Sequence, residues 1–189
     1  MKRIAQLSGI TFGAIMIVLS FGIAVETILR KFFSHSLGGI DELAGYAVAV
    51  VAPLTFIVAA FEQAHIRINI LHGKLPLQVR AVLNMVAAGS LGLLSLFLLY
   101  FTVKTVQETL AYRSIAQTPW ATPLIYPQTL WLVAMLSFTV AMLVIAARTV
   151  MLAVRGDWVT LDRKYSPGSA QEELDAELAD LKSREGAQP

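Results

Sequence analysis

The segment Phe61–Pro76, FEQAHIRINILHGKLP, separates two long apolar runs and carries an ordered set of polar side chains. We refer to it as the central strip. Its polar members are Glu62, His65, Arg67, Asn69 and His72. Isoleucine and leucine residues alternate with them, which keeps the segment apolar as well as charged. Such a mixture is typical of a connection that lies along a membrane surface.

The composition of the whole chain excludes an ordinary soluble domain. The chain has 189 residues, of which 56% are hydrophobic and only 15% are charged, and its mean hydropathy is +0.65. It contains no cysteine, so disulfide frameworks and Cys-ligated metals are excluded. A formal charge of +2 gives no argument for a nucleic-acid partner. The sequence therefore predicts an all-α integral membrane protein.

Charged residues avoid four windows almost completely, and each window is long enough to cross about 30 Å of hydrocarbon. The predicted membrane spans are residues 10–29, 43–61, 81–103 and 129–150. The first window also fits a signal peptide, but its apolar run exceeds the usual signal core, so we expect a retained membrane helix. Residues 1–156 are the predicted four-helix membrane domain. Residues 157–189 are predicted to be an acidic cytoplasmic tail, partly disordered or forming a short amphipathic helix.

The distribution of basic residues predicts the orientation of the four spans. Four spans place both termini on one side, where nine Lys or Arg residues lie near the membrane: Lys2, Arg3, Arg67, Lys74, Arg80, Arg148, Arg155, Arg163 and Lys164. The opposite side has four: Arg30, Lys31, Lys104 and Arg113. The positive-inside rule therefore predicts cytoplasmic termini and a cytoplasmic central strip.

Local spacing predicts several helix contacts. Gly45, Ala49 and Ala52 form a smooth stripe that would let another helix approach closely. Glu42 and its neighbour Asp41 stand where carboxylates complement a helix N-terminus. Glu26 is the deepest acid and stands four residues before Arg30, so an ion pair on one helix face is expected.

Two motif regions resemble the small membrane subunit of tripartite ATP-independent periplasmic (TRAP) transporters. The first is the central strip, in which the matching positions are His65, Arg67, Asn69 and Leu71, with Asn69 where the family usually has Asp. The second precedes the last span, at Thr122, Pro123, Pro127 and Trp131.

This resemblance implies a function. In TRAP systems a periplasmic binding protein captures an organic acid, and a large membrane subunit moves it inward using an ion gradient, usually sodium. The chain would then be the scaffold subunit in a bacterial inner membrane, with the large subunit, the binding protein and the lipid bilayer as partners and with no cofactor. The candidate residues for subunit or membrane interfaces are Glu42, Gly45, Ala49, Ala52, His65, Arg67, Asn69, Pro123 and Pro127. Arg67 could pair with a partner carboxylate or act as a topology charge.

Two alternatives from other classes stay open. The chain could be the membrane anchor of a redox enzyme complex, although its three histidines lie in predicted loops rather than helices. It could also be a small self-contained transporter, which needs an acid within the membrane, and only Glu26 is available. No catalytic, nucleotide-binding or metal-protease motif is present, so the sequence predicts no enzyme.

Overall fold

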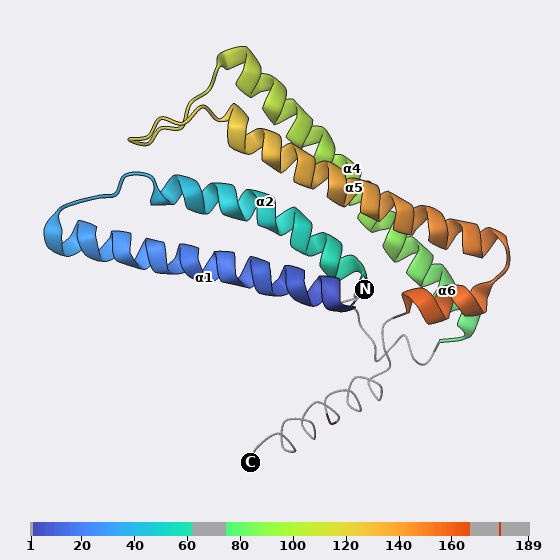
Figure 1. Cartoon of the computed structure of the whole chain (residues 1–189). Coiled ribbons are helices and arrows are strands. Elements are labelled where there is room, and N and C mark those ends of the chain that lie inside the picture. The colour runs from blue at the N-terminus through green and yellow to red at the C-terminus, as the bar shows by residue number, and fades with distance from the viewer. Residues whose placement is uncertain (1, 62–74, 167–177, 179–189) are drawn as a thin grey trace.

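The computed structural model describes residues 2–61, 75–166 and 178. Within these ranges the chain forms α1 (Lys2–Phe33), α2 (Ile40–Phe61), α4 (Leu77–Tyr112), α5 (Ile125–Val154) and α6 (Trp158–Tyr165) (Figure 1). The only β-type pairing among the described residues is an isolated bridge between Ile115 and Pro123. The predicted all-α fold is confirmed.

Four of these helices are long and apolar enough to cross a membrane. The candidate spans are Gly9–Phe33, Ile40–Phe61, Leu77–Tyr112 and Ile125–Val154. Each contains one predicted span and extends beyond it. The extension is greatest in α4, where Val106 and Thr109 are buried nearly two turns beyond the predicted end at residue 103. The helix therefore continues where charged residues enter the sequence, because one of its faces still packs against a neighbour.

The closest helix pair is α4 and α5, and small and hydroxyl side chains line its contact face. Ala88, Gly92 and Ser95 are all buried on α4. A Cβ added to Gly92 would lie 3.4 Å from the Cβ of Ala146 on α5, so the two backbones approach closely. The Thr139 hydroxyl donates to the Ser95 carbonyl at 3.2 Å, across the same contact face. In lipid, close packing and such hydrogen bonds replace the hydrophobic effect in holding helices together.

Helix α2 also packs against α5. The buried side chains of Met135, Phe138 and Met142 form the core, and partly buried residues from α2 and α4 pack around them. On the α2 side, the ring of Phe56 lies 5.9 Å from that of Phe138, measured between centroids. Helix α5 is therefore shared by two neighbours, which explains why its apolar span is the most buried of the four.

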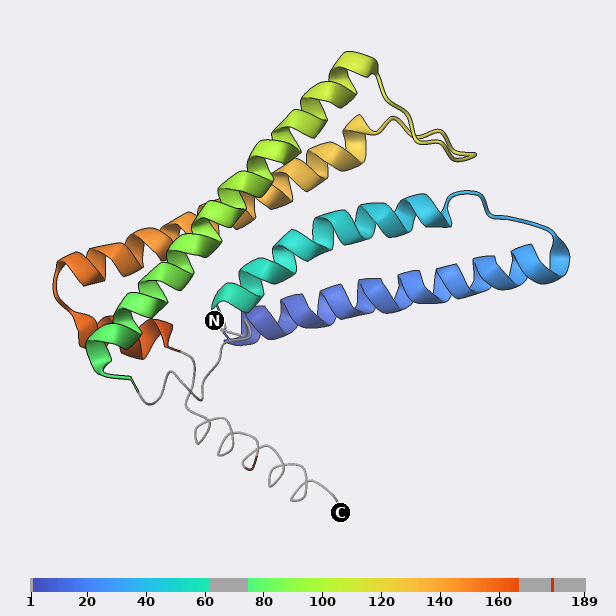
Figure 2. The same ribbon diagram turned by 180° about the vertical axis from the view of Figure 1, so that it is seen from behind.

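Helix α1 packs mainly on α2 and completes an antiparallel hairpin (Figures 1 and 2). Only 6% of its apolar span is buried, the lowest share of the four spans. The start of α1, the end of α2, the start of α4 and the end of α5 lie at one end of the molecule, which we call the terminal end. The loops 34–39 and 113–124 lie at the other end, which we call the loop end.

The short helix α6 lies inside the region predicted as a tail. Gly156 has a φ of +70°, a conformation that favours glycine, and it turns the chain after α5. Asp157 then caps α6, since its side chain accepts a hydrogen bond from the Thr160 amide at 3.1 Å. Leu161 and Tyr165 are buried against α4 and α5. The first part of the predicted tail is therefore packed on the membrane helices. The residues predicted as an amphipathic helix, 174–181, lie outside the described residues apart from Leu178.

Candidate subunit-interface site

The candidate interface residues fall into three groups in the structure. His65, Arg67 and Asn69 belong to the central strip and lie outside the described residues. Glu42, Gly45, Ala49 and Ala52 follow one another along α2. Pro123 and Pro127 lie at the loop end, where loop 113–124 enters α5. The structure therefore places the second and third groups, and Thr122, which precedes Pro123, lies beside Tyr46 of α2.

Glu42 is a buried carboxylate rather than an exposed cap. Its residue is only 6% exposed, and its Oε2 accepts a hydrogen bond from the Tyr46 hydroxyl at 3.0 Å. The Thr122 side chain of loop 113–124 lies beside the same tyrosine. The other oxygen of Glu42 has no hydrogen-bond partner among the described residues. Glu42 therefore does more than complement the helix dipole. It holds the Tyr46 side chain, and Tyr46 in turn contacts loop 113–124.

The small-residue stripe on α2 is exposed at Gly45 and half-buried at Ala49 and Ala52. Gly45 is exposed, and a Cβ added to it would meet nothing within 4 Å. Ala52 lines an open apolar groove of about 380 Å³ between α1 and α2, together with Gly9 and Gly13 of α1. No described helix of this chain covers the stripe at Gly45. The predicted contact of this face with a helix of a second subunit stays a prediction.

The two prolines shape the loop that leads into α5. Pro123 is exposed and bridges to Ile115, while Ala116 donates to the Thr122 carbonyl at 2.9 Å. Loop 113–124 is therefore a short hairpin. Pro127 lies in the first turn of α5, where a missing N–H costs no helical hydrogen bond.

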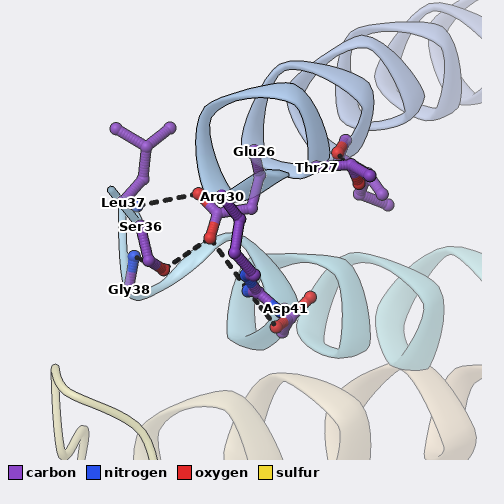
Figure 3. Close-up of polar contacts among 8 residues, drawn as sticks. Glu26, Thr27, Arg30, Ser36, Leu37, Gly38 and Asp41 are labelled. Carbon is purple, nitrogen blue, oxygen red and sulfur yellow. Dashed lines mark hydrogen bonds and ion pairs between the residues drawn. The ribbon is translucent and has the colours of Figure 1, made fainter. Parts of the chain in front are cut away.

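The Glu26 carboxylate organises the loop between α1 and α2 (Figure 3). It is 3% exposed and accepts hydrogen bonds from the Ser36 hydroxyl at 2.5 Å and from the Leu37 amide at 2.8 Å. Arg30 donates to it at 2.9 Å, which confirms the predicted pair four residues apart. Arg30 also lies 3.5 Å from Asp41 at the start of α2. This acid therefore fixes the turn between two helices.

That loop is held against the hairpin 113–124 by a contact that sequence analysis did not identify. Gly39 is buried, and a Cβ added to it would lie 2.1 Å from Cε2 of Trp120. A Cβ at Gly38 would lie 3.2 Å from Pro119. The indole ring therefore occupies the space of a missing side chain. A pair of adjacent glycines, such as Gly38 and Gly39, indicates a turn from sequence alone, but it does not indicate what packs against that turn.

A second ion pair was also missed, at the terminal end. Arg80, counted in the sequence only as a topology charge, donates to Asp162 of α6 at 2.7 Å. Three buried polar atoms of this pair and its neighbour on α4 have no hydrogen-bond partner among the described residues. They are Arg80 Nε, Asp162 Oδ1 and Asn84 Nδ2. In α6 itself, burial raises the pKa of the Tyr165 hydroxyl. The sequence contained a signal for the packing of α6, because Leu161 and Tyr165 are four residues apart and share one helical face beside Asp162.

These positions limit the chemistry that the described residues can perform. The buried acids are Glu26, about two turns before the end of α1, Glu42, in the first turn of α2, and Asp162 on α6, and each has a hydrogen-bonding partner. Among the described residues, no three His, Cys, Asp or Glu side chains are grouped so as to hold a metal ion. The arrangement is that of a structural unit whose polar contacts join helices at their ends.

Comparison with known proteins agrees with this arrangement. Residues 19–155 match the family model described as tripartite ATP-independent periplasmic transporters, DctQ component. The match covers well over half of the chain, including both motif regions and parts or all of the four long helices. No curated protein and no solved structure matches the chain significantly. The chain therefore belongs to the DctQ family, the small membrane component of TRAP transporters.

Proposed function

We propose that this chain is the scaffold subunit of a TRAP secondary transporter that imports an organic acid. In this proposal a large membrane subunit carries the substrate and the coupling ion, and a periplasmic binding protein delivers the substrate. An ion gradient, expected to be of sodium, drives transport. The exposed Gly45 end of the stripe is the observation that carries the proposal, since it offers a close-packing surface that no described helix of this chain covers.

The burial of charged groups supports a scaffold rather than a transport pathway. In the part of the chain that the structure describes, each buried acid accepts a hydrogen bond or forms an ion pair, and none lies at the centre of a membrane span. A pathway for ions or protons would place ionisable groups within the spans. The large subunit is therefore the expected site of ion coupling. The inner membrane is the expected location, as the family's periplasmic partner implies.

The interface can be tested by closing the stripe with a bulky side chain. Gly45→Leu and Ala49→Leu should each prevent close helix approach and lower co-purification of the large subunit by about tenfold or more. Transport by proteoliposomes that contain both membrane subunits and the binding protein should fall in parallel. Gly89→Leu on α4 is the matched control, because its added Cβ also meets nothing within 4 Å. Normal complex yield in both α2 variants would remove this face from the interface.

We also propose that the terminal end faces the cytoplasm and the loop end faces the periplasm, as the basic residues indicate. The chain has no cysteine, so single cysteines can report the orientation. A membrane-impermeant thiol reagent added outside intact cells should label Gln117→Cys, which lies in the exposed hairpin, and should not label Ser169→Cys. Gln117 is preferable to Ser36, whose hydroxyl bonds to Glu26. The reverse labelling pattern would contradict this orientation.

A further inference from the structure

Helix α6 presents a basic surface at the depth where the membrane ends. It begins four residues after Val154, the last residue of α5. Its inner face is fixed by the buried side chain of Leu161 and by the ion pair between Asp162 and Arg80. Because this inner face packs against α4 and α5, the opposite face of α6 points away from the helix bundle.

That outer face combines exposed apolar and basic side chains. Val159 is 64% exposed, and Arg163 follows it four residues later, one helical turn along the same face. Just before α6, Val154 is 83% exposed and Arg155 is exposed as well. Apolar side chains that penetrate a lipid surface, next to cations at headgroup level, are typical of interfacial helices.

The local charge is strongly positive. The basic residues of α6, of the last two turns of α5 with its C-cap and of the first turn of α4 are Arg80, Arg148, Arg155, Arg163 and Lys164. The acids of the same region are Asp157 and Asp162. Asp157 caps α6, and Asp162 pairs with Arg80. Among the described residues, neither acid forms an ion pair with Arg155 or Arg163, and both of these residues are exposed, so they are available to a negatively charged ligand.

We propose that α6 and the end of α5 bind the headgroup of an anionic phospholipid. Arg155 and Arg163 contact the phosphate, since a guanidinium forms charge-assisted and bidentate hydrogen bonds to phosphate oxygens. Val154 and Val159 lie against the upper acyl chains. Charge complementarity and the position of the surface at the end of a membrane span favour a lipid over an acidic protein. The buried pair of Arg80 and Asp162 holds α6 in the required position.

The experiment uses the full chain, delipidated in a neutral detergent. Phosphatidylglycerol or phosphatidylcholine is added, and the lipid retained on the protein is measured by native mass spectrometry. The parent protein should retain phosphatidylglycerol in preference to phosphatidylcholine, and raised salt should weaken that preference. The double variant Arg155→Gln/Arg163→Gln should lose the preference by roughly 20-fold, since each basic residue at an anionic surface contributes about fivefold.

Lys104→Gln/Arg113→Gln is the matched control, because it removes two positive charges from the loop end. It should keep the preference of the parent. Equal loss in both double variants would show a general charge effect and overturn the proposal. The absence of any phosphatidylglycerol preference in the parent would also overturn it. A third result would overturn the proposal as well. If Arg155→Gln/Arg163→Gln retains lipid normally but no longer co-purifies with the large subunit, this surface binds a protein partner.

Discussion

Replacing Asp162 with alanine is expected to destabilise the docking of α6 on the helix bundle by about 2–3 kcal/mol. The change leaves the Arg80 guanidinium at the helix junction without its carboxylate. Removing one partner of a fully buried ion pair costs about 3–5 kcal/mol. The cost is smaller here because the Arg80 side chain is 29% exposed and gains some hydration. Hydrogen exchange at the Leu161 and Tyr165 amides measures this docking directly.

Two further variants separate the ion pair from general effects on α6. Arg80→Met/Asp162→Leu removes both charges together and should protect the α6 amides nearly as well as the parent, since paired apolar side chains can replace a buried ion pair. Asp157→Ala removes only the cap, which is worth about 1 kcal/mol. If Asp162→Ala exchanges like the parent protein, the ion pair does not hold α6.

Replacing Gly39 with alanine is expected to destabilise the loop end by about 1–3 kcal/mol, the usual cost of overpacking. The new Cβ would lie 2.1 Å from the Trp120 ring, so the indole must move away from the loop between α1 and α2. Thermal unfolding in detergent measures the lost stability. Tryptophan fluorescence should shift to longer wavelength as Trp120 becomes more exposed to water.

The matched control is Gly45→Ala, whose added Cβ meets nothing within 4 Å. It should leave stability unchanged or raise it by about 0.5–1 kcal/mol, because alanine favours a helix interior over glycine. Gly39→Ala/Trp120→Ala should be more stable than Gly39→Ala alone, because the clash is gone. If Gly39→Ala unfolds at the parent's temperature, Trp120 does not occupy that space in solution.

Periodicity and hydropathy predicted the helices but not their full length. Apolar runs identified all four spans, and the spacing of Glu26 and Arg30 identified one ion pair. The predicted spans stopped where charged residues began. In α4 the helix continues through Lys104, because the contact with α5 depends on one face and not on the composition of every turn.

Contacts between distant segments could not be predicted from one sequence. The packing of Gly39 under Trp120 joins residues about 80 positions apart, and neither residue type specifies the other. The pair of Arg80 and Asp162 has a similar separation. Glu42 was expected at a helix N-terminus, which is correct, but its burial depends on Tyr46 and on a loop beside Thr122. By contrast, the small residues Ala88 and Gly92 stand four residues apart and are both buried on α4, because such spacing acts through the local shape of the helix.

The attachment of α1 to α2 has a consequence for how the chain is made. The main helix contacts join α1 to α2 and α4 to α5, and each pair is a hairpin of neighbours in sequence. Within the described chain, the α2–α5 contact and the packing of Trp120 on Gly39 join the two hairpins. Each hairpin can therefore form as the ribosome releases it, before the other exists, and a single docking step in the bilayer completes the unit. Coexpressed halves of the protein, divided between α2 and α4, should reassemble in the same way.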